Sequence, residues 1–159
     1  MRAACPGRTT SRVGWRPEMK PMLEYRVGAR RIDSHGSVAS AKEAEIILDT
    51  DVGGRPDAFN PAELFLAAIA ACMIKGIERV TPMIKFDLRG VEVKLHGIRQ
   101  DSPPKMISVD YELIVDTDET DQRLELLHTN VRKYGTISNT VAAATKLEGV
   151  IRRREWQPT

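Results

Sequence analysis

The sequence is poor in cysteine, histidine and aromatic residues, and each shortage excludes a class of protein. Cys5 and Cys72 are the only cysteines among 159 residues, too few for a disulfide framework. Of the three histidines, His35, His96 and His128, the last is expected on the surface or at an interface. They stand far apart, and no two have the spacing of metal ligands. We therefore expect no structural metal site and no bound cofactor.

Long uninterrupted apolar runs are also missing, so we expect no membrane-spanning segment. The longest apolar stretch begins after Asn60, and Glu63, Lys75 and Glu78 interrupt it. A hydrophobic content of 42% with 29% charged residues fits a soluble globular protein. With so few cysteines, a reducing, cytoplasmic location is expected.

The positive charge of the chain is concentrated in its first 22 residues. The formal net charge is +2, yet residues 1–22 hold five basic groups and one acidic group, which leaves the other 137 residues with a net charge of −2. We therefore expect no nucleic-acid-binding surface. Residues 1–22 lack apolar periodicity and are expected to be a disordered extension, with a targeting peptide as the alternative. Residues 23–159 are then a single domain.

Hydrophobic periodicity predicts five strands and three helices. Strands are expected at residues 24–31, 43–48, 91–95, 107–115 and 147–154, and helices at 61–80, 118–134 and 139–146. Strands and helices come in blocks rather than in strict alternation, which predicts an α+β fold with mainly antiparallel sheet.

The helix expected at 61–80 has a clear start. Asn60 is a favoured N-cap, Pro61 suits the first helical position, and Glu63 can close a capping box. The helix is apolar on nearly every side, so other structure must wrap it. Because one thin sheet cannot cover it, we expect a second copy of the chain to do so in an obligate homodimer.

Cys72 lies within this helix and is either a small core residue or a reactive thiol. It follows Asn60 by twelve residues, beyond the reach of the helix dipole. A reactive thiolate would therefore need a nearby cation. Lys75, three residues on, occupies the neighbouring face of the helix, although its ammonium group is equally suited to remain in solvent.

Two sets of residues resemble the OsmC/Ohr family of osmotically induced and organic hydroperoxide resistance proteins. The first set is Gly53-Gly54, 60–64 and 70–72, and the second is 135–140. The resemblance extends over about residues 24–154. It implies mainly antiparallel sheets wrapped around a long buried central helix, in an intertwined homodimer. It also implies reduction of organic hydroperoxides in oxidative stress, at sites on the dimer interface.

The resemblance aligns Cys72 with the family's peroxidatic cysteine, which attacks the peroxide and becomes a sulfenic acid. The family's second, resolving cysteine falls at Gly135, so this chain is a divergent member without it. The family's carboxylate falls at Ala62, with Glu63 next to it. Nine helical residues place Glu63 about half a turn and ~13.5 Å away from Cys72, so it would act on the partner's site or serve only as a cap.

The arginine that activates the family's thiol has no certain counterpart here. Arg55 in the glycine-rich loop is the first candidate, and the others are Arg26, Arg30 and Arg31. The candidate catalytic residues are therefore Cys72, Glu63 and Arg55.

Three functions follow from these residues. The first is one-cysteine, thiol-dependent reduction of small organic hydroperoxides at Cys72, with an external thiol as reductant. The second is a non-catalytic module that binds a small, lipid-like apolar ligand in an interfacial pocket. The third is a structural or partner-binding dimer with an inert thiol. A cysteine hydrolase is disfavoured because no histidine is placed as a base.

Overall fold

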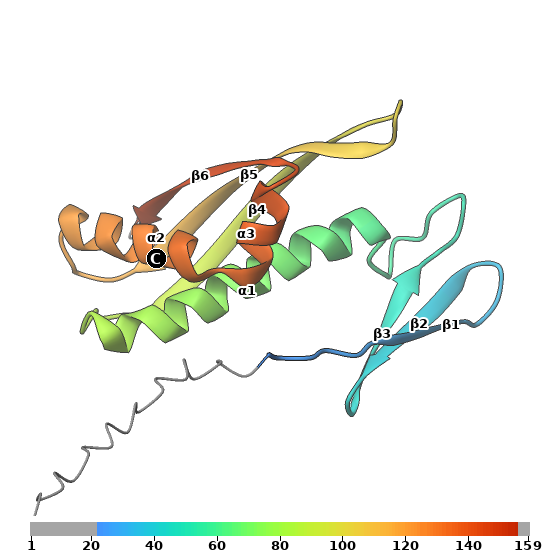
Figure 1. The fold of residues 1–159 in the computed structure, drawn as a ribbon, viewed down its shortest axis with the longest axis horizontal. Helices are drawn as coiled ribbons and strands as arrows, with labels where there is room; N and C mark the ends of the chain where they lie inside the picture. The colour runs from blue at the N-terminus through green and yellow to red at the C-terminus, as the bar shows by residue number, and fades with distance from the viewer. Residues whose placement is uncertain (1–21, 156–159) are drawn as a thin grey trace, which may run out of the picture.

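The computed structural model describes residues 22–155, so the extension expected at 1–22 lies, except for Met22, outside the described residues. The chain forms six strands and three helices there (Figure 1). In chain order these are β1 (Gly28–Arg31), β2 (Gly36–Ala41), β3 (Ala44–Asp49), α1 (Pro61–Met83), β4 (Gly90–Gln100), β5 (Lys105–Asp116), α2 (Asp121–Tyr134), α3 (Thr136–Ala142) and β6 (Lys146–Arg153).

The strands form two separate three-stranded sheets. The first has the order β1-β2-β3 and is antiparallel throughout. The second has the order β4-β5-β6, in which β4 and β5 form the expected antiparallel hairpin and β6 runs parallel to β5. The α+β class with mainly antiparallel sheet is confirmed.

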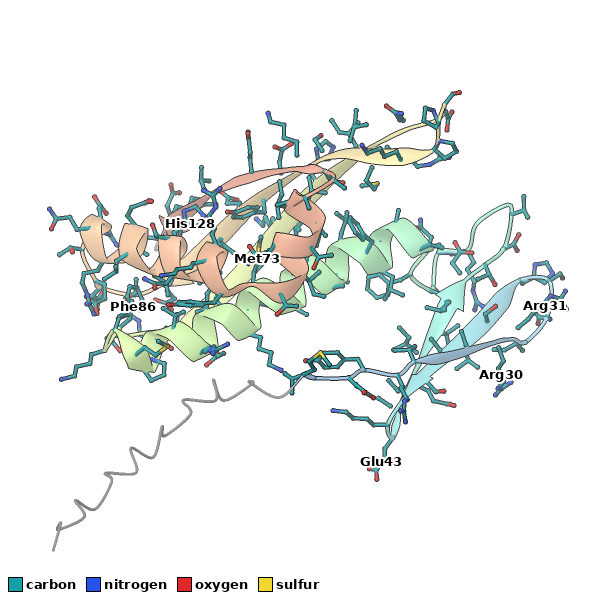
Figure 2. All side chains as sticks on the ribbon, in the orientation of Figure 1. Arg30, Arg31, Glu43, Met73, Phe86 and His128 are labelled. Atoms are coloured by element: carbon teal, nitrogen blue, oxygen red, sulfur yellow. The ribbon has the colours of Figure 1, made fainter. Side chains whose placement is uncertain are left out.

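The core lies between α1, α2 and the second sheet. Ile69, Met73 and Ile77 recur along one face of α1 and are buried there. Figure 2 labels Met73 on this face. They belong to one cluster with Leu113 of β5 and Leu127 of α2.

Helix α1 and helix α2 approach each other closely at a glycine. A Cβ atom at Gly76 would lie 3.4 Å from Cγ1 of Val131, an ordinary contact with no space left over. The α1 backbone at Gly76 therefore packs directly against Val131 of α2.

The start of α1 is as the sequence predicts. The Asn60 side chain accepts hydrogen bonds from the backbone N–H groups of Ala62 and Glu63, at 2.9 and 3.0 Å. The Glu63 carboxylate accepts one from the Asn60 N–H at 2.9 Å, which closes the capping box. The helix continues to Met83, three residues past the expected end, and includes Pro82 in its last turn.

Strand β1 starts at Gly28 rather than 24 and α2 at Asp121 rather than 118, and two further elements differ more from the sequence prediction. Strand β2 was not expected, because Gly, Ser and Ala make up most of Gly36–Ala41 and have little intrinsic preference for strands. Helix α3 starts at Thr136 rather than 139. Its N-cap is Gly135, which has no side chain to cap the helix. Ser138 therefore lies inside the helix, where it is buried.

The first sheet stands apart from the rest of the chain (Figure 1). Ile46 and Ile47 of β3 are each 44% exposed, and Phe59 in the following loop is 55% exposed. The outward face of α1 is also uncovered, with Ala71 and Ile74 exposed. Within the described residues, these two apolar surfaces have no cover from the same chain.

Candidate functional site

Cys72 lies at the border between the buried and the uncovered face of α1. Its neighbours Ile69 and Met73 point into the core, whereas Ala71 points outward. The Cys72 side chain is partly buried and forms no disulfide. A thiol in this position packs partly against the core and is partly accessible from the uncovered face.

Two cations lie on the same side of α1 as Cys72. Lys75 follows by three residues, and Arg79 follows by seven, which places it within about 20° of Cys72 around the helix. Both are exposed. Among residues 22–155, neither has a carboxylate partner within ion-pair distance.

The aromatic ring of Tyr134, at the end of α2, lies beside these cations. The guanidinium carbon of Arg79 is 5.8 Å from the ring centroid, and Nζ of Lys133 is 5.3 Å from it. The end of α2 therefore adds to the positive charge on this side of α1.

Gly135, where the sequence resemblance places the family's resolving cysteine, follows Tyr134 directly and is buried. Its φ of −76° would suit any residue, so the backbone does not demand glycine. The space around Gly135 is tight, because a Cβ atom there would lie 3.1 Å from Oγ of Ser138 and 3.3 Å from the carbonyl oxygen of Val131. A side chain at this position would require its neighbours to shift.

Glu63 and Arg55 lie away from Cys72 in the single chain. Glu63 is held in the capping box at the start of α1, about 13.5 Å along the helix axis from Cys72. Arg55 lies in the loop before α1 and donates two hydrogen bonds of 2.6 Å to Asp57. This ion pair raises the pKa of Arg55 and lowers that of Asp57.

The remaining arginine candidates lie on or beside the separate sheet. Arg30 and Arg31 are exposed on β1 (Figure 2), and Arg26, also exposed, precedes that strand and pairs with Glu24. Thus the single chain brings none of Arg26, Arg30 and Arg31 to the thiol.

The sequence interpretation misplaced His128, which is buried rather than on the surface or at an interface. It is 5% exposed, and its Nε2 shares a 2.8 Å hydrogen bond with the hydroxyl of Tyr111, also buried. The two rings meet edge to face, with centroids 5.8 Å apart. Burial lowers the pKa of His128 and raises that of Tyr111. The signal was present, since His128 completes the core stripe of Leu124, Leu127 and Val131.

A family model for OsmC-like proteins matches residues 54–149, which include α1, Cys72, both halves of the hairpin and all of α2 and α3. The chain belongs to the OsmC-like family. No curated protein matches it.

Solved structures of OsmC-like proteins share the fold. One is an OsmC-like protein from Mycoplasma pneumoniae, with a TM-score of 0.76 at 16% identity over 84% of this chain and 99% of that one. Another is an organic hydroperoxide resistance protein from Legionella pneumophila, with a TM-score of 0.64 at 19% identity over 83% and 98%. A third is the organic hydroperoxide resistance protein OhrB of Bacillus subtilis, with a TM-score of 0.57 at 17% identity over 82% and 98%. At these identities the likeness establishes the fold alone.

Two further findings concern the described residues as a whole. No helix within residues 22–155 is both long and apolar enough to cross a membrane. In the same part of the chain, no three His, Cys, Asp or Glu side chains come together as a metal-binding group.

Proposed function

We propose that this OsmC-like protein is a one-cysteine, thiol-dependent peroxidase that reduces organic hydroperoxides through Cys72. The observation that carries the proposal is the partly buried, free thiol of Cys72 in the capped α1, inside the segment matched by the family. We assign the positive charge that a thiolate needs to Lys75 and Arg79, which follow Cys72 on the same side of the helix.

The reaction requires two external thiols per turnover. The Cys72 thiolate attacks the terminal peroxide oxygen, the O–O bond breaks, and the alcohol leaves after taking up a proton, with Cys72 oxidised to a sulfenic acid. One thiol condenses with the sulfenic acid and releases water. A second thiol attacks the resulting mixed disulfide and restores Cys72. Gly135 has no thiol, so it cannot resolve the sulfenic acid by forming a disulfide with Cys72.

The active form in this proposal is a homodimer. The uncovered face of α1 and the exposed Ile46 and Ile47 of the separate sheet are two apolar surfaces that a second copy could bury against each other. Such an arrangement would bring the partner's β1, with Arg30 and Arg31, or its loop with Arg55, toward the thiol. The proposal names no nucleic acid and no membrane as partner.

The test compares the two cysteines of the chain. In the presence of cumene hydroperoxide and dithiothreitol, we expect Cys72→Ser to lower the rate of peroxide loss on the order of a thousandfold or more, because the nucleophile is gone. Cys5→Ser is the matched control and should retain the rate. By intact mass, the wild type and Cys5→Ser should each gain one oxygen, and Cys72→Ser should gain none. An unchanged rate in Cys72→Ser would refute the proposal.

The alternative is a non-catalytic module that binds a small apolar ligand. Gly135 in place of a resolving thiol and the engagement of Glu63 in the capping box favour it. It predicts a ligand that co-purifies with the protein and is seen by mass spectrometry after denaturation. Clean, ligand-free protein with rapid peroxide turnover would exclude this alternative.

A further inference from the structure

A cavity of about 350 Å³ opens between α2, α3 and the second sheet. This volume lies within the range of small-molecule sites in proteins. Its apolar lining comes from four elements and from the core face of α1: Met73, Tyr111, Leu113, Val131, Ala142 and Leu147. Cys72 does not line it, although its neighbour Met73 does, so the cavity is separate from the thiol.

The inner wall of the cavity is apolar although Tyr111 contributes to it. The Tyr111 hydroxyl shares a 2.8 Å hydrogen bond with Nε2 of His128, so it already has a hydrogen-bond partner within the protein. Burial lowers the pKa of His128, which favours the neutral ring behind that wall. The Tyr111–His128 pair is therefore uncharged, and apart from the hydroxyl of Ser138 the buried part of the lining is apolar, so hydrocarbon suits it better than a charged group.

The exposed rim of the cavity is basic. Arg132 and Lys133, at the end of α2, both line it and are exposed. Within the described residues, neither lies within ion-pair distance of a carboxylate. Thr129 and Asn139 add polar groups to the lining. The rim thus offers positive charge and hydrogen-bonding groups to an anion.

We propose that this cavity binds an aliphatic monocarboxylate of medium chain length. The hydrocarbon chain lies against Met73, Leu113 and Leu147, and the carboxylate lies at the rim with Arg132 and Lys133. The match of an apolar interior to one charged rim argues for this occupant, because a neutral hydrocarbon would leave the rim unused and a small anion would leave the interior empty. The site stands apart from the peroxidase proposal, since its lining contains none of Cys72, Lys75 and Arg79.

The experiment measures binding of decanoate to the full-length protein by isothermal titration calorimetry below its micelle concentration. Two variants fill the cavity from different elements: Ala142→Phe on α3 and Thr129→Phe on α2, both at exposed positions with little risk to folding. Ala143→Phe, next to Ala142 but outside the lining, is the matched control. We expect each filling variant to weaken binding tenfold or more, on the order of two buried methylene groups, and the control to bind like wild type.

The charge is tested in the same way. Arg132→Gln and Lys133→Gln should each weaken decanoate binding several-fold, whereas Lys105→Gln, at an exposed position on β5 outside the cavity, should not. Decanol should bind more weakly than decanoate. Octanoate should bind about fifteenfold more weakly than decanoate, since it lacks two methylenes and each buried methylene is worth about a fourfold change.

Each outcome decides the proposal. Absence of decanoate binding to wild type, or wild-type binding in both filling variants, would overturn it. Equal binding of decanol and decanoate would overturn the carboxylate assignment. Cys72→Ser should bind decanoate like wild type; loss of binding in that variant would place the ligand at the thiol instead and refute a separate site. Loss of peroxidase activity in Cys72→Ser has no bearing on these results.

Discussion

His128 loses its access to water when α2 packs against β5, and its surroundings decide its protonation. Burial lowers its pKa. Of the charged side chains that act on it, Glu125 raises the pKa and Arg132 lowers it, and both lie on α2. From β5 it meets the neutral Tyr111 hydroxyl. The folded protein therefore binds a proton at His128 less readily than the unfolded chain does.

This difference predicts a loss of stability in mild acid. Because the folded pKa lies below the unfolded value of about 6.5, the stability is fully present above that pH and is lost as the pH falls through the folded pKa. We expect the urea-measured free energy of unfolding to fall more steeply from pH 7.5 to 5.5 in the wild type than in His128→Gln, by at most about 1.4 kcal/mol per pH unit.

A second histidine acts in the opposite direction and must be removed from the comparison. The hydrogen bond to Asp51, at 2.6 Å, raises the pKa of His35, so its contribution is present in acid and lost as the pH rises through the folded pKa. Both proteins are therefore compared in a His35→Gln background. Parallel pH profiles for the two would contradict the assignment of the effect to His128.

Helix α1 begins with a capping box that uses the one carboxylate proposed for catalysis, so stability and activity must be separated at this element. Asn60→Ala removes the acceptor for two backbone N–H groups and should cost about 1 kcal/mol of unfolding free energy. Glu63→Gln should cost only a few tenths, since glutamine also closes a capping box.

The Glu63 variants then distinguish its two roles through paired measurements. If Glu63 is only a cap, Glu63→Gln keeps peroxidase activity, and Glu63→Ala loses stability and little else. A fall in kcat for Glu63→Gln at unchanged melting temperature would instead assign its carboxylate to the reaction. We expect the first result, because the carboxylate is engaged 2.9 Å from the Asn60 N–H.

At the scale of the molecule, the separate first sheet and the uncovered face of α1 predict a homodimer. Ala71 is exposed in the single chain and lies at the centre of that face. We expect wild type to elute with the mass of a dimer in size-exclusion chromatography with light scattering, and Ala71→Glu to shift it toward monomer, because a buried unpaired carboxylate is costly.

The matched control is Gln122→Glu, at an exposed position on α2 that keeps the same charge change away from this face. It should leave the mass unchanged. A monomeric wild type that stays folded at micromolar concentration would contradict the prediction.

The sequence by itself determined the elements whose signals are local. Asn60, Pro61 and Glu63 set the start of α1, because a cap depends on residues within one turn. Alternating residues placed the β4-β5 hairpin, and a motif shared with the OsmC/Ohr family singled out Cys72. These features depend on short-range geometry and periodicity, which the local sequence encodes directly.

Only the tertiary structure decided the features that depend on residues far apart in the chain. Strand β2 exists because its neighbours supply hydrogen bonds to small residues with little strand preference of their own. The Tyr111–His128 pair joins residues 17 positions apart, and the cavity above it needs side chains from five elements. Such arrangements follow from packing between elements, and no local pattern encodes which buried polar groups will meet.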